Sequence, residues 1–204
     1  MEYKEEVHSG KCAVKVLIVV SQSYGMKVAI IDNGSALLEQ LKTAVSSALG
    51  LRPEVLTYPD ISVDRYDWLV FSGRARRSSE TDLWMNNLIR LSQDRPAVFI
   101  CYAAEFLNLS RGGSLRRIGT HLYGLYDAVF EENNVGIPSG RHAVFESRSL
   151  SVARLGAGLK PIASGNGIEA FVSDTGQLGL MFHPEMSNDF GLGTLRAYFK
   201  GKYF

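Results

Sequence analysis

The feature that most constrains the fold is an alternation, between residues 26 and 109, of short apolar runs and segments with helical periodicity. The first run, Lys27–Ile31, is rich in β-branched residues and ends at the turn signal Asp32-Asn33-Gly34. The next segment starts with Ser35, which can cap a helix, repeats apolar residues at helical spacing and ends at Gly50. This alternation is typical of a parallel sheet with helices on both faces. The other expected strands of this part are Glu54–Leu56, Tyr66–Phe71 and Ala97–Cys101, and the other helices are Asp82–Leu91 and Tyr102–Leu109.

The second part of the chain has a different pattern. After Gly112 and Gly113, short strand-like stretches joined by turns replace the alternation. They cover Ile118–Phe130, Ala143–Phe145 and Pro161–Val172. Leu178–Phe182 returns to the pattern of a buried strand, and Gly191–Phe199 predicts a closing helix. We therefore expect an α/β fold, with an open parallel sheet, helices on both of its faces and a small antiparallel strand region.

Size and charge favour one ordinary globular domain, over residues 26–204. The chain has 204 residues and a formal net charge of +1, so no overall charge draws it to nucleic acid or to a membrane surface. No apolar run is long enough to cross a bilayer, and two cysteines cannot form a disulfide framework. We expect a cytoplasmic protein. Residues 1–25 are a leader of doubtful status: either translation starts at Met26, or the leader is a genuine extension in which Val14–Val20 adds an edge strand or a partner contact.

Cys101 is the first candidate for chemistry, because it lies where a predicted parallel strand meets a helix. In open α/β folds this carboxyl edge of the sheet is where sites are built. The helix that follows points its N–H groups toward the thiol, and its dipole favours the reactive thiolate. A thiolate that attacks a carboxamide also needs an imidazole to hold and return the proton.

His183 is the best placed of the four histidines, because it follows the strand Leu178–Phe182 at the same edge. Pro184 and Glu185 come next in the chain. Proline restricts the backbone, and the carboxylate can then orient the imidazole and stabilise its protonated form. Cys101, His183 and Glu185 together predict a nucleophile with its two activating partners.

At these residues the chain resembles the class I glutamine amidotransferases. The family's nucleophile motif, Gly-x-Cys-x-Gly-x-Gln, falls on residues 99–105 (FICYAAE), and its His-Pro-Glu motif falls on residues 183–185. Its Ser-Gly-Gly-Pro loop falls on residues 72–75 (SGRA). The resemblance covers roughly residues 26–200, and the three motifs occur in the family's order and spacing.

The resemblance implies a flavodoxin-like fold that hydrolyses glutamine to glutamate and ammonia through a thioester on Cys101. It also implies a synthetase partner that uses ATP and takes up the ammonia. The opening IIDNGS and the closing HPEMSNDFGLGTLRAYF are most similar to the glutaminase subunit of a two-subunit GMP synthetase. By the family's pattern, backbone N–H groups of Tyr102 and of the Gly73–Arg74 loop hold the oxyanion, and Glu105 lies near the substrate. No cofactor and no metal are expected.

The chain departs from the family's pattern at several positions, five of which bear on the site or its surroundings. Phe99 and Ala103 replace the glycines beside the nucleophile, Arg74 replaces the second loop glycine, Glu105 replaces a glutamine, and Arg148 replaces a histidine. Three functions fit these departures: an active but divergent glutaminase, a hydrolase of another γ-glutamyl amide, or a catalytically impaired regulatory or interaction subunit.

Simpler interpretations exist for each residue. Cys101 could be a buried core cysteine and His183 a structural histidine. A zinc site is disfavoured because no CxxC or HxxxH pair exists, and a flavin site because no hydroxyl-rich phosphate loop follows the first strand. The run Arg74, Arg76 and Arg77 is either a solvated loop face or a surface that docks an acidic partner or holds a carboxylate.

Overall fold

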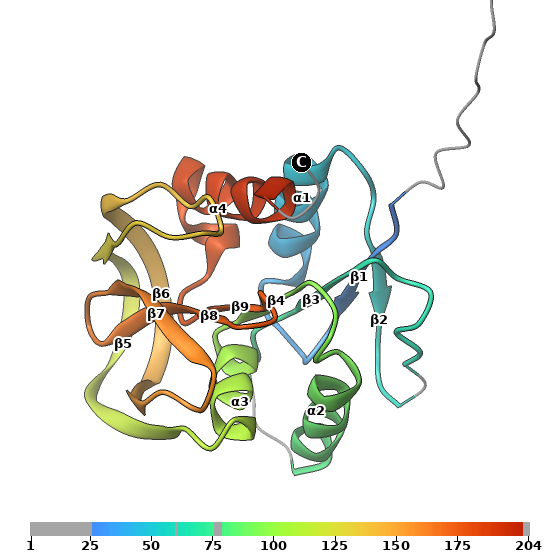
Figure 1. Ribbon diagram of the computed structural model, residues 1–204, viewed down its shortest axis with the longest axis horizontal. Helices are drawn as coiled ribbons and strands as arrows, with labels where there is room; N and C mark the ends of the chain where they lie inside the picture. The colour runs from blue at the N-terminus through green and yellow to red at the C-terminus, as the bar shows by residue number, and fades with distance from the viewer. Residues whose placement is uncertain (1–25, 60, 76–78, 202–204) are drawn as a thin grey trace, which may run out of the picture.

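The computed structural model describes residues 26–59, 61–75 and 79–201, and these residues form one sheet flanked by helices (Figure 1). The leader 1–25, with Cys12, and the residues Arg76 and Arg77 lie outside this part. The strands are β1 (Val28–Ile31), β2 (Glu54–Leu56), β3 (Trp68–Phe71), β4 (Ala97–Ile100), β5 (Ser114–Phe130), β6 (Gly140–Arg154), β7 (Leu159–Ser164), β8 (Ile168–Ser173) and β9 (Leu178–Leu180). The helices are α1 (Leu38–Leu49), α2 (Ser79–Leu91), α3 (Tyr102–Ser110) and α4 (Asn188–Gly201), with a short 3-10 turn η1 (Pro184–Met186).

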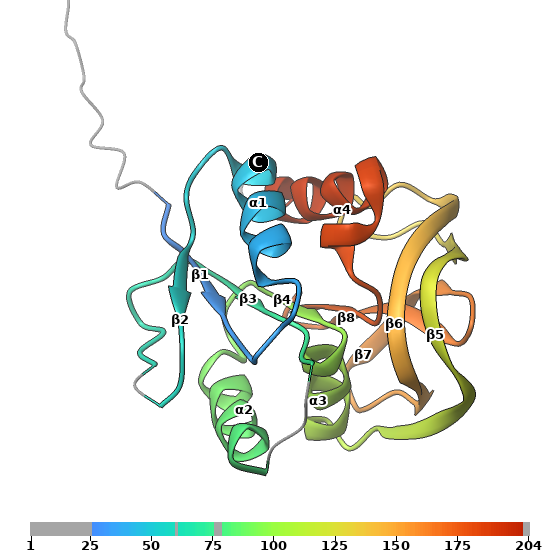
Figure 2. The same ribbon diagram turned by 180° about the vertical axis from the view of Figure 1, so that it is seen from behind.

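The sheet has nine strands in the order β2-β1-β3-β4-β9-β8-β7-β5-β6. The strands from β2 to β9 in this order run parallel to one another. Helices α1 and α4 cover one face of this parallel part, and α2 and α3 cover the other (Figures 1 and 2). The α/β class and the presence of helices on both faces are therefore confirmed.

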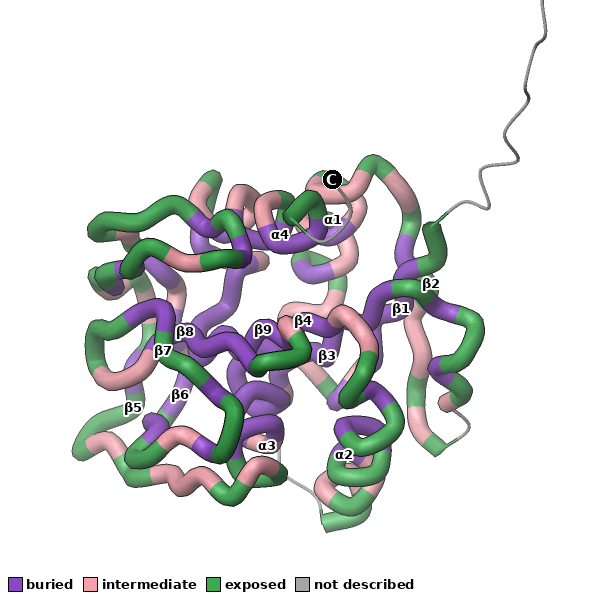
Figure 3. Tube along the Cα trace, viewed as in Figure 1, coloured by how far each residue is buried: buried purple, intermediate pink, exposed green. Residues whose placement is uncertain are grey.

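The parallel strands are apolar throughout because both of their faces are buried. Every residue of β1, β3, β4 and β9 is buried, and Figure 3 shows these strands as the buried centre of the molecule. Alternate residues enter different cores: Ile30 packs in the core that includes α1 and α4, and Ile31 in the one that includes α2 and α3. This two-sided packing holds the carboxyl ends of β3, β4 and β9 close together.

The antiparallel region is larger than expected and belongs to the same sheet. Strand β8 pairs antiparallel with β9, and β7, β5 and β6 continue the sheet to a curled end (Figure 2). The predicted short strand Ala143–Phe145 is part of the much longer β6. The sequence pattern underestimated β6 because polar residues such as Glu146 and Arg148 occupy its buried face.

Two helix starts also differ from expectation. Ser35 does not cap α1; the capping position is Leu37, and the Ser35 hydroxyl accepts the Leu37 N–H at 3.1 Å in the preceding turn. The α2 helix starts at Ser79, one turn before the expected start at Asp82. Gly50 ends α1 in the left-handed conformation, as predicted. Among the described residues, none of the helices is long and apolar enough to span a membrane.

Candidate active site

Cys101 lies in a strained turn between β4 and α3. Its φ is 49° and its ψ is −108°, a combination that a residue with a side chain rarely adopts. The Cys101 N–H donates to the Leu180 carbonyl of β9 at 2.6 Å, and the Cys101 carbonyl accepts the Glu105 N–H at 3.0 Å. The turn is thus held from both sides, and the side chain is placed at the start of the helix, as in nucleophile elbows.

His183 follows β9, the strand next to β4 in the sheet. Its Nδ1 atom lies 2.8 Å from Oε1 of Glu185, whose side chain is fully buried. The His183 N–H donates to the Phe145 carbonyl of β6 at 2.8 Å. The Cys101 thiol is 3.8 Å from the Ser147 carbonyl, two residues further along β6. Strand β6 therefore contacts both members of the pair.

Opposing effects act on the pKa of His183. Burial lowers this pKa, but the adjacent Cys101 and the Glu185 carboxylate raise it more strongly, and the resulting pKa is about 10. The imidazole is consequently protonated at neutral pH. A protonated imidazole beside a cysteine favours the thiolate, the form that acts as a nucleophile.

The loop Ser72–Ala75 packs directly against this pair. A Cβ atom added to Gly73 would lie 2.8 Å from Cε1 of His183 and 3.6 Å from Cβ of Cys101. Only a glycine leaves room for the imidazole at this distance. The structure therefore brings the predicted loop, nucleophile and histidine together at the carboxyl edge of β3, β4 and β9.

The Arg74 side chain is buried rather than solvated, so the interpretation as a solvated loop face is wrong for this side chain. Its side chain is 3% exposed, and its Nη1 donates to Oδ1 of Asp82 at 2.8 Å and to the Tyr102 hydroxyl at 2.7 Å. The guanidinium also lies 4.8 Å from the centroid of the Tyr102 ring. The Tyr102 hydroxyl in turn donates to Asp82. Arg74 thus connects the loop to both α2 and α3.

Glu105, the remaining predicted binding residue, is buried in the first turn of α3, one turn after Cys101. All seven predicted site residues fall within the same region of the fold. Of the other histidines, His121 contacts the Ser149 hydroxyl at 2.9 Å and His142 stacks on Phe190. Within residues 26–59, 61–75 and 79–201, no group of three or more histidine, cysteine or acidic side chains is arranged to hold a metal ion.

Solved structures with a similar fold include glutamine amidotransferases. A protein of Thermoplasma acidophilum named as a GMP synthase subunit superposes with a TM-score of 0.75 at 23% identity, over 86% of this chain and 93% of the other. A glutamine amidotransferase of Thermotoga maritima gives a TM-score of 0.65 at 18% identity, over 86% of this chain and 83% of the other. The chain has the glutamine amidotransferase fold. The resemblance seen in the sequence is thereby confirmed.

One curated relative shares detectable sequence similarity with this chain. It is the glutamine-hydrolysing GMP synthase of Bdellovibrio bacteriovorus, 27% identical over 135 residues. The match covers 65% of this chain but only 26% of the relative, so the chain matches about a quarter of that protein's length. No protein-family model matches the chain.

The amidotransferase fold accommodates two of the departures from the family's pattern within its core. Phe99 is fully buried and stacks on Phe71 of the neighbouring strand, with ring centroids 4.5 Å apart and planes 7° apart. Ala103 is fully buried in the same core. At position 99, where the family's pattern has glycine, this chain has a phenylalanine ring that packs on Phe71.

Two polar residues that support the site were not predicted from the sequence. The Ser187 hydroxyl donates to the His183 carbonyl at 2.6 Å and accepts the Phe145 N–H at 2.9 Å, so it joins the histidine turn to β6. The Asn33 amide donates to the Ser72 carbonyl at 2.6 Å. Both residues belong to the stretches that resemble the family, but neither has a spacing that marks it as part of a site.

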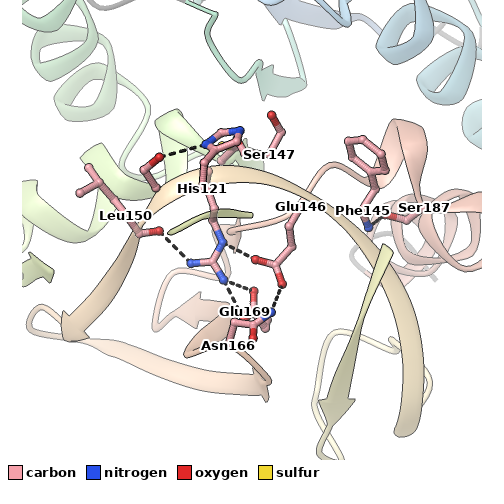
Figure 4. Close-up of polar contacts among 11 residues, drawn as sticks. His121, Phe145, Glu146, Ser147, Leu150, Asn166, Glu169 and Ser187 are labelled. Atoms are coloured by element: carbon pink, nitrogen blue, oxygen red, sulfur yellow. Dashed lines mark hydrogen bonds and ion pairs between the residues drawn. The ribbon is translucent and has the colours of Figure 1, made fainter. Parts of the chain in front are cut away.

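A buried ion-pair network joins β6, the strand that contacts Cys101, to β8 of the same sheet (Figure 4). Arg148 donates to Oε2 of Glu146 at 2.7 Å and to both carboxylate oxygens of Glu169 at 2.7 and 2.8 Å. Asn166 donates to the other oxygen of Glu146 at 2.9 Å. Arg148 therefore ties β6 to β8, which is a structural use of the position where the family has a histidine.

Proposed function

We propose that the chain is a glutaminase that hydrolyses glutamine to glutamate and ammonia through a thioester on Cys101. The observation that carries the proposal is the placement of Cys101 in a strained strand–helix turn beside His183, which is itself bonded to Glu185 at 2.8 Å. This is the arrangement that nucleophilic catalysis by cysteine requires: a nucleophile, a proton carrier and a group that orients the carrier. The amidotransferase fold and the GMP synthase relative support the same class of reaction.

In the first half-reaction the Cys101 thiolate attacks the side-chain carboxamide carbon of glutamine, and a C–S bond forms. The carbonyl oxygen becomes an oxyanion, which we assign to backbone N–H groups of Tyr102 and of the Gly73–Arg74 loop. Tyr102 is the first residue of α3, so its N–H has no acceptor within the helix. Protonated His183 then gives its proton to the leaving nitrogen, the C–N bond breaks, and ammonia departs.

In the second half-reaction a water molecule attacks the thioester, and neutral His183 accepts its proton. The C–S bond breaks, glutamate leaves, and the thiolate and the imidazolium are restored. Glu185 keeps its hydrogen bond to Nδ1 throughout, which fixes the imidazole and favours its protonated form. The high pKa of His183 in the resting site fits this cycle, because the reaction starts and ends with the protonated ring.

We further propose that the ammonia passes to a separate ATP-using synthetase, and that this is a GMP synthetase. The support is the similarity to the GMP synthase subunit of Thermoplasma acidophilum and to part of the longer Bdellovibrio enzyme. The parallel order β2-β1-β3-β4-β9 also fits the flavodoxin-like core expected for such a protein.

The test is glutamate release from glutamine by the purified chain, compared with a Cys101→Ala variant. Release that depends on Cys101 supports the glutaminase, and stimulation by a GMP synthetase ATPase subunit supports the proposed acceptor. If a folded chain that binds this subunit releases no glutamate, the proposal fails. The regulatory subunit then becomes the better interpretation. The exception is a chain that hydrolyses another γ-glutamyl amide, a substrate class suggested by Glu105 in place of glutamine.

A further inference from the structure

The two residues assigned to the oxyanion site are bonded to each other through their side chains. One expected donor is a backbone N–H of the Gly73–Arg74 loop, and the other is the backbone N–H of Tyr102. The Arg74 guanidinium contacts the Tyr102 hydroxyl at 2.7 Å and lies over its ring, and Asp82 accepts from both side chains. A contact between these side chains limits how far the loop can move from the start of α3.

The loop is also held on its other side. The Asn33 N–H donates to the Ser72 hydroxyl at 2.9 Å and its amide to the Ser72 carbonyl at 2.6 Å, while Tyr58 donates to Asn33 at 2.7 Å. At the far end of the loop, the Ala75 N–H donates to the Gly34 carbonyl at 3.0 Å. The loop is therefore attached to the β1–α1 turn, to α2 and to α3.

We propose that Arg74 is a positioning residue that fixes the oxyanion loop against Tyr102, so that the glutaminase site is assembled in the chain alone, without a partner. This inference rests on the proposed function and concerns its regulation, because a site that is already assembled needs no partner to form it. Arg74 stands where the resembled family has glycine, so the side chain that makes the contact is specific to this departure. The Arg74 side chain is 3% exposed and its acidic partner Asp82 is 35% exposed, so the contact is partly shielded from water, and hydrogen bonds of a charged donor are stronger than neutral ones.

The experiment compares wild type, Arg74→Gly and Tyr102→Phe for glutamine hydrolysis and for alkylation of Cys101 by iodoacetamide. Alkylation needs the thiolate but forms no oxyanion, so it reports on Cys101 and His183 separately from the loop. We expect wild type to hydrolyse glutamine alone, Arg74→Gly to lower kcat at least about tenfold, and Tyr102→Phe to lower it by a smaller factor. Alkylation of the peptide that contains Cys101, measured by mass spectrometry, should stay within about twofold of wild type in both variants.

Arg65 provides a matched control of the same chemistry. It donates to the Tyr66 hydroxyl at 3.0 Å and to Glu54 at 2.7 Å, and its guanidinium lies 5.1 Å from the centroid of the Tyr66 ring. This cluster lies at the turn before β3, at the opposite end of that strand from Ser72. Arg65→Gly should leave both kcat and alkylation at wild-type values, which controls for the removal of an arginine stacked on a tyrosine, although the Arg65 side chain is 60% exposed.

Three results would overturn the inference. Arg74→Gly could keep the wild-type kcat, or its kcat and alkylation rate could fall together, which would mean that the nucleophile itself is displaced. In both cases Cys101-dependent hydrolysis by wild type leaves the proposed function intact. The third result is a wild-type chain that hydrolyses no glutamine alone. Labelling of Cys101 by a diazoketone analogue of glutamine would then show that the glutaminase assignment survives. Absence of labelling would show that the glutaminase assignment fails together with the inference.

Discussion

A Cβ atom at Gly73 would lie 2.8 Å from Cε1 of His183, closer than a carbon atom can approach without displacement. The imidazole has little room to move away, because its Nδ1 is bonded to Glu185 and its backbone is bonded to Phe145 and Ser187. The loop that is expected to hold the oxyanion therefore also limits the position of His183, the proposed proton carrier.

Gly73→Ala should separate His183 from Cys101. We expect kcat for glutamine hydrolysis to fall at least about tenfold, and alkylation of Cys101 to slow as well, because the imidazolium no longer stabilises the thiolate. Steady-state kinetics and iodoacetamide labelling measure the two effects. Gly119→Ala is the control, since an added Cβ there meets no atom within 4 Å. Wild-type kcat in Gly73→Ala would show that the loop yields to the new methyl group.

Glu185→Gln should change the pH dependence of the reaction. The Glu185 carboxylate helps to raise the pKa of His183 to about 10. In the proposed reaction, protonated His183 is the form that donates to the leaving nitrogen. Without the carboxylate this pKa falls, so the imidazolium is lost at a lower pH. We expect the alkaline limb of kcat/KM to move toward lower pH. A profile with the same alkaline limb as wild type would argue against His183 as the proton donor.

The positions of the three proposed catalytic residues could be predicted from the sequence because they depend on local pattern. Cys101 and His183 each follow a short apolar run, and such runs place the next residue at the carboxyl edge of a parallel sheet. The position of Glu185 near His183 could be predicted because Pro184, which lies between them, restricts the backbone. Local pattern could not show that β4 and β9 are neighbours, with Ile100 opposite Leu180, since strand order depends on the whole sheet.

The supporting contacts could not be predicted because they join residues far apart in the chain. The partner of Arg74 is Asp82 in α2, and nothing in the loop sequence marks the arginine as buried. Arg148 and Glu169 come from different strands, and their charges make β6 look like an exposed segment. Burial of paired charges breaks the alternation of polar and apolar residues on which strand prediction depends.

Gly191→Ala should damage both stability and activity. A Cβ atom at Gly191 would collide with the Pro184 carbonyl oxygen, so α4 could not keep its contact with the histidine turn. We expect a lower melting temperature and a kcat reduced several-fold, measured by thermal unfolding and glutaminase assay. Gly193→Ala on the same helix is the control, because a Cβ there meets no atom within 4 Å and alanine favours the helix. Equal behaviour of the two variants would contradict the close packing at Gly191.

The network under β6 holds two carboxylates against one guanidinium. Burial of Glu169 raises its pKa, Arg148 lowers it and Glu146 raises it again, with a resulting value of about 7. The folded protein therefore binds a proton at Glu169 more tightly than the unfolded chain does. The stability that this proton contributes is complete below the ordinary pKa of 4.5 and is lost as the pH rises to about 7.

Glu169→Gln should remove this pH dependence, because glutamine imitates the protonated carboxyl group and does not titrate. As the pH rises from 4.5 to 7, the difference in free energy of unfolding between the variant and wild type should change in favour of the variant by on the order of 1–3 kcal/mol. A constant difference that is already present at pH 4.5 does not affect this change. Urea unfolding at several pH values measures the difference. Asp127→Asn serves as the control, since its carboxylate is 63% exposed and pairs only with Arg141 on the surface among the described residues. A difference between wild type and Glu169→Gln that stays constant across this range would show that Glu169 is already ionised in the folded protein at the lower pH.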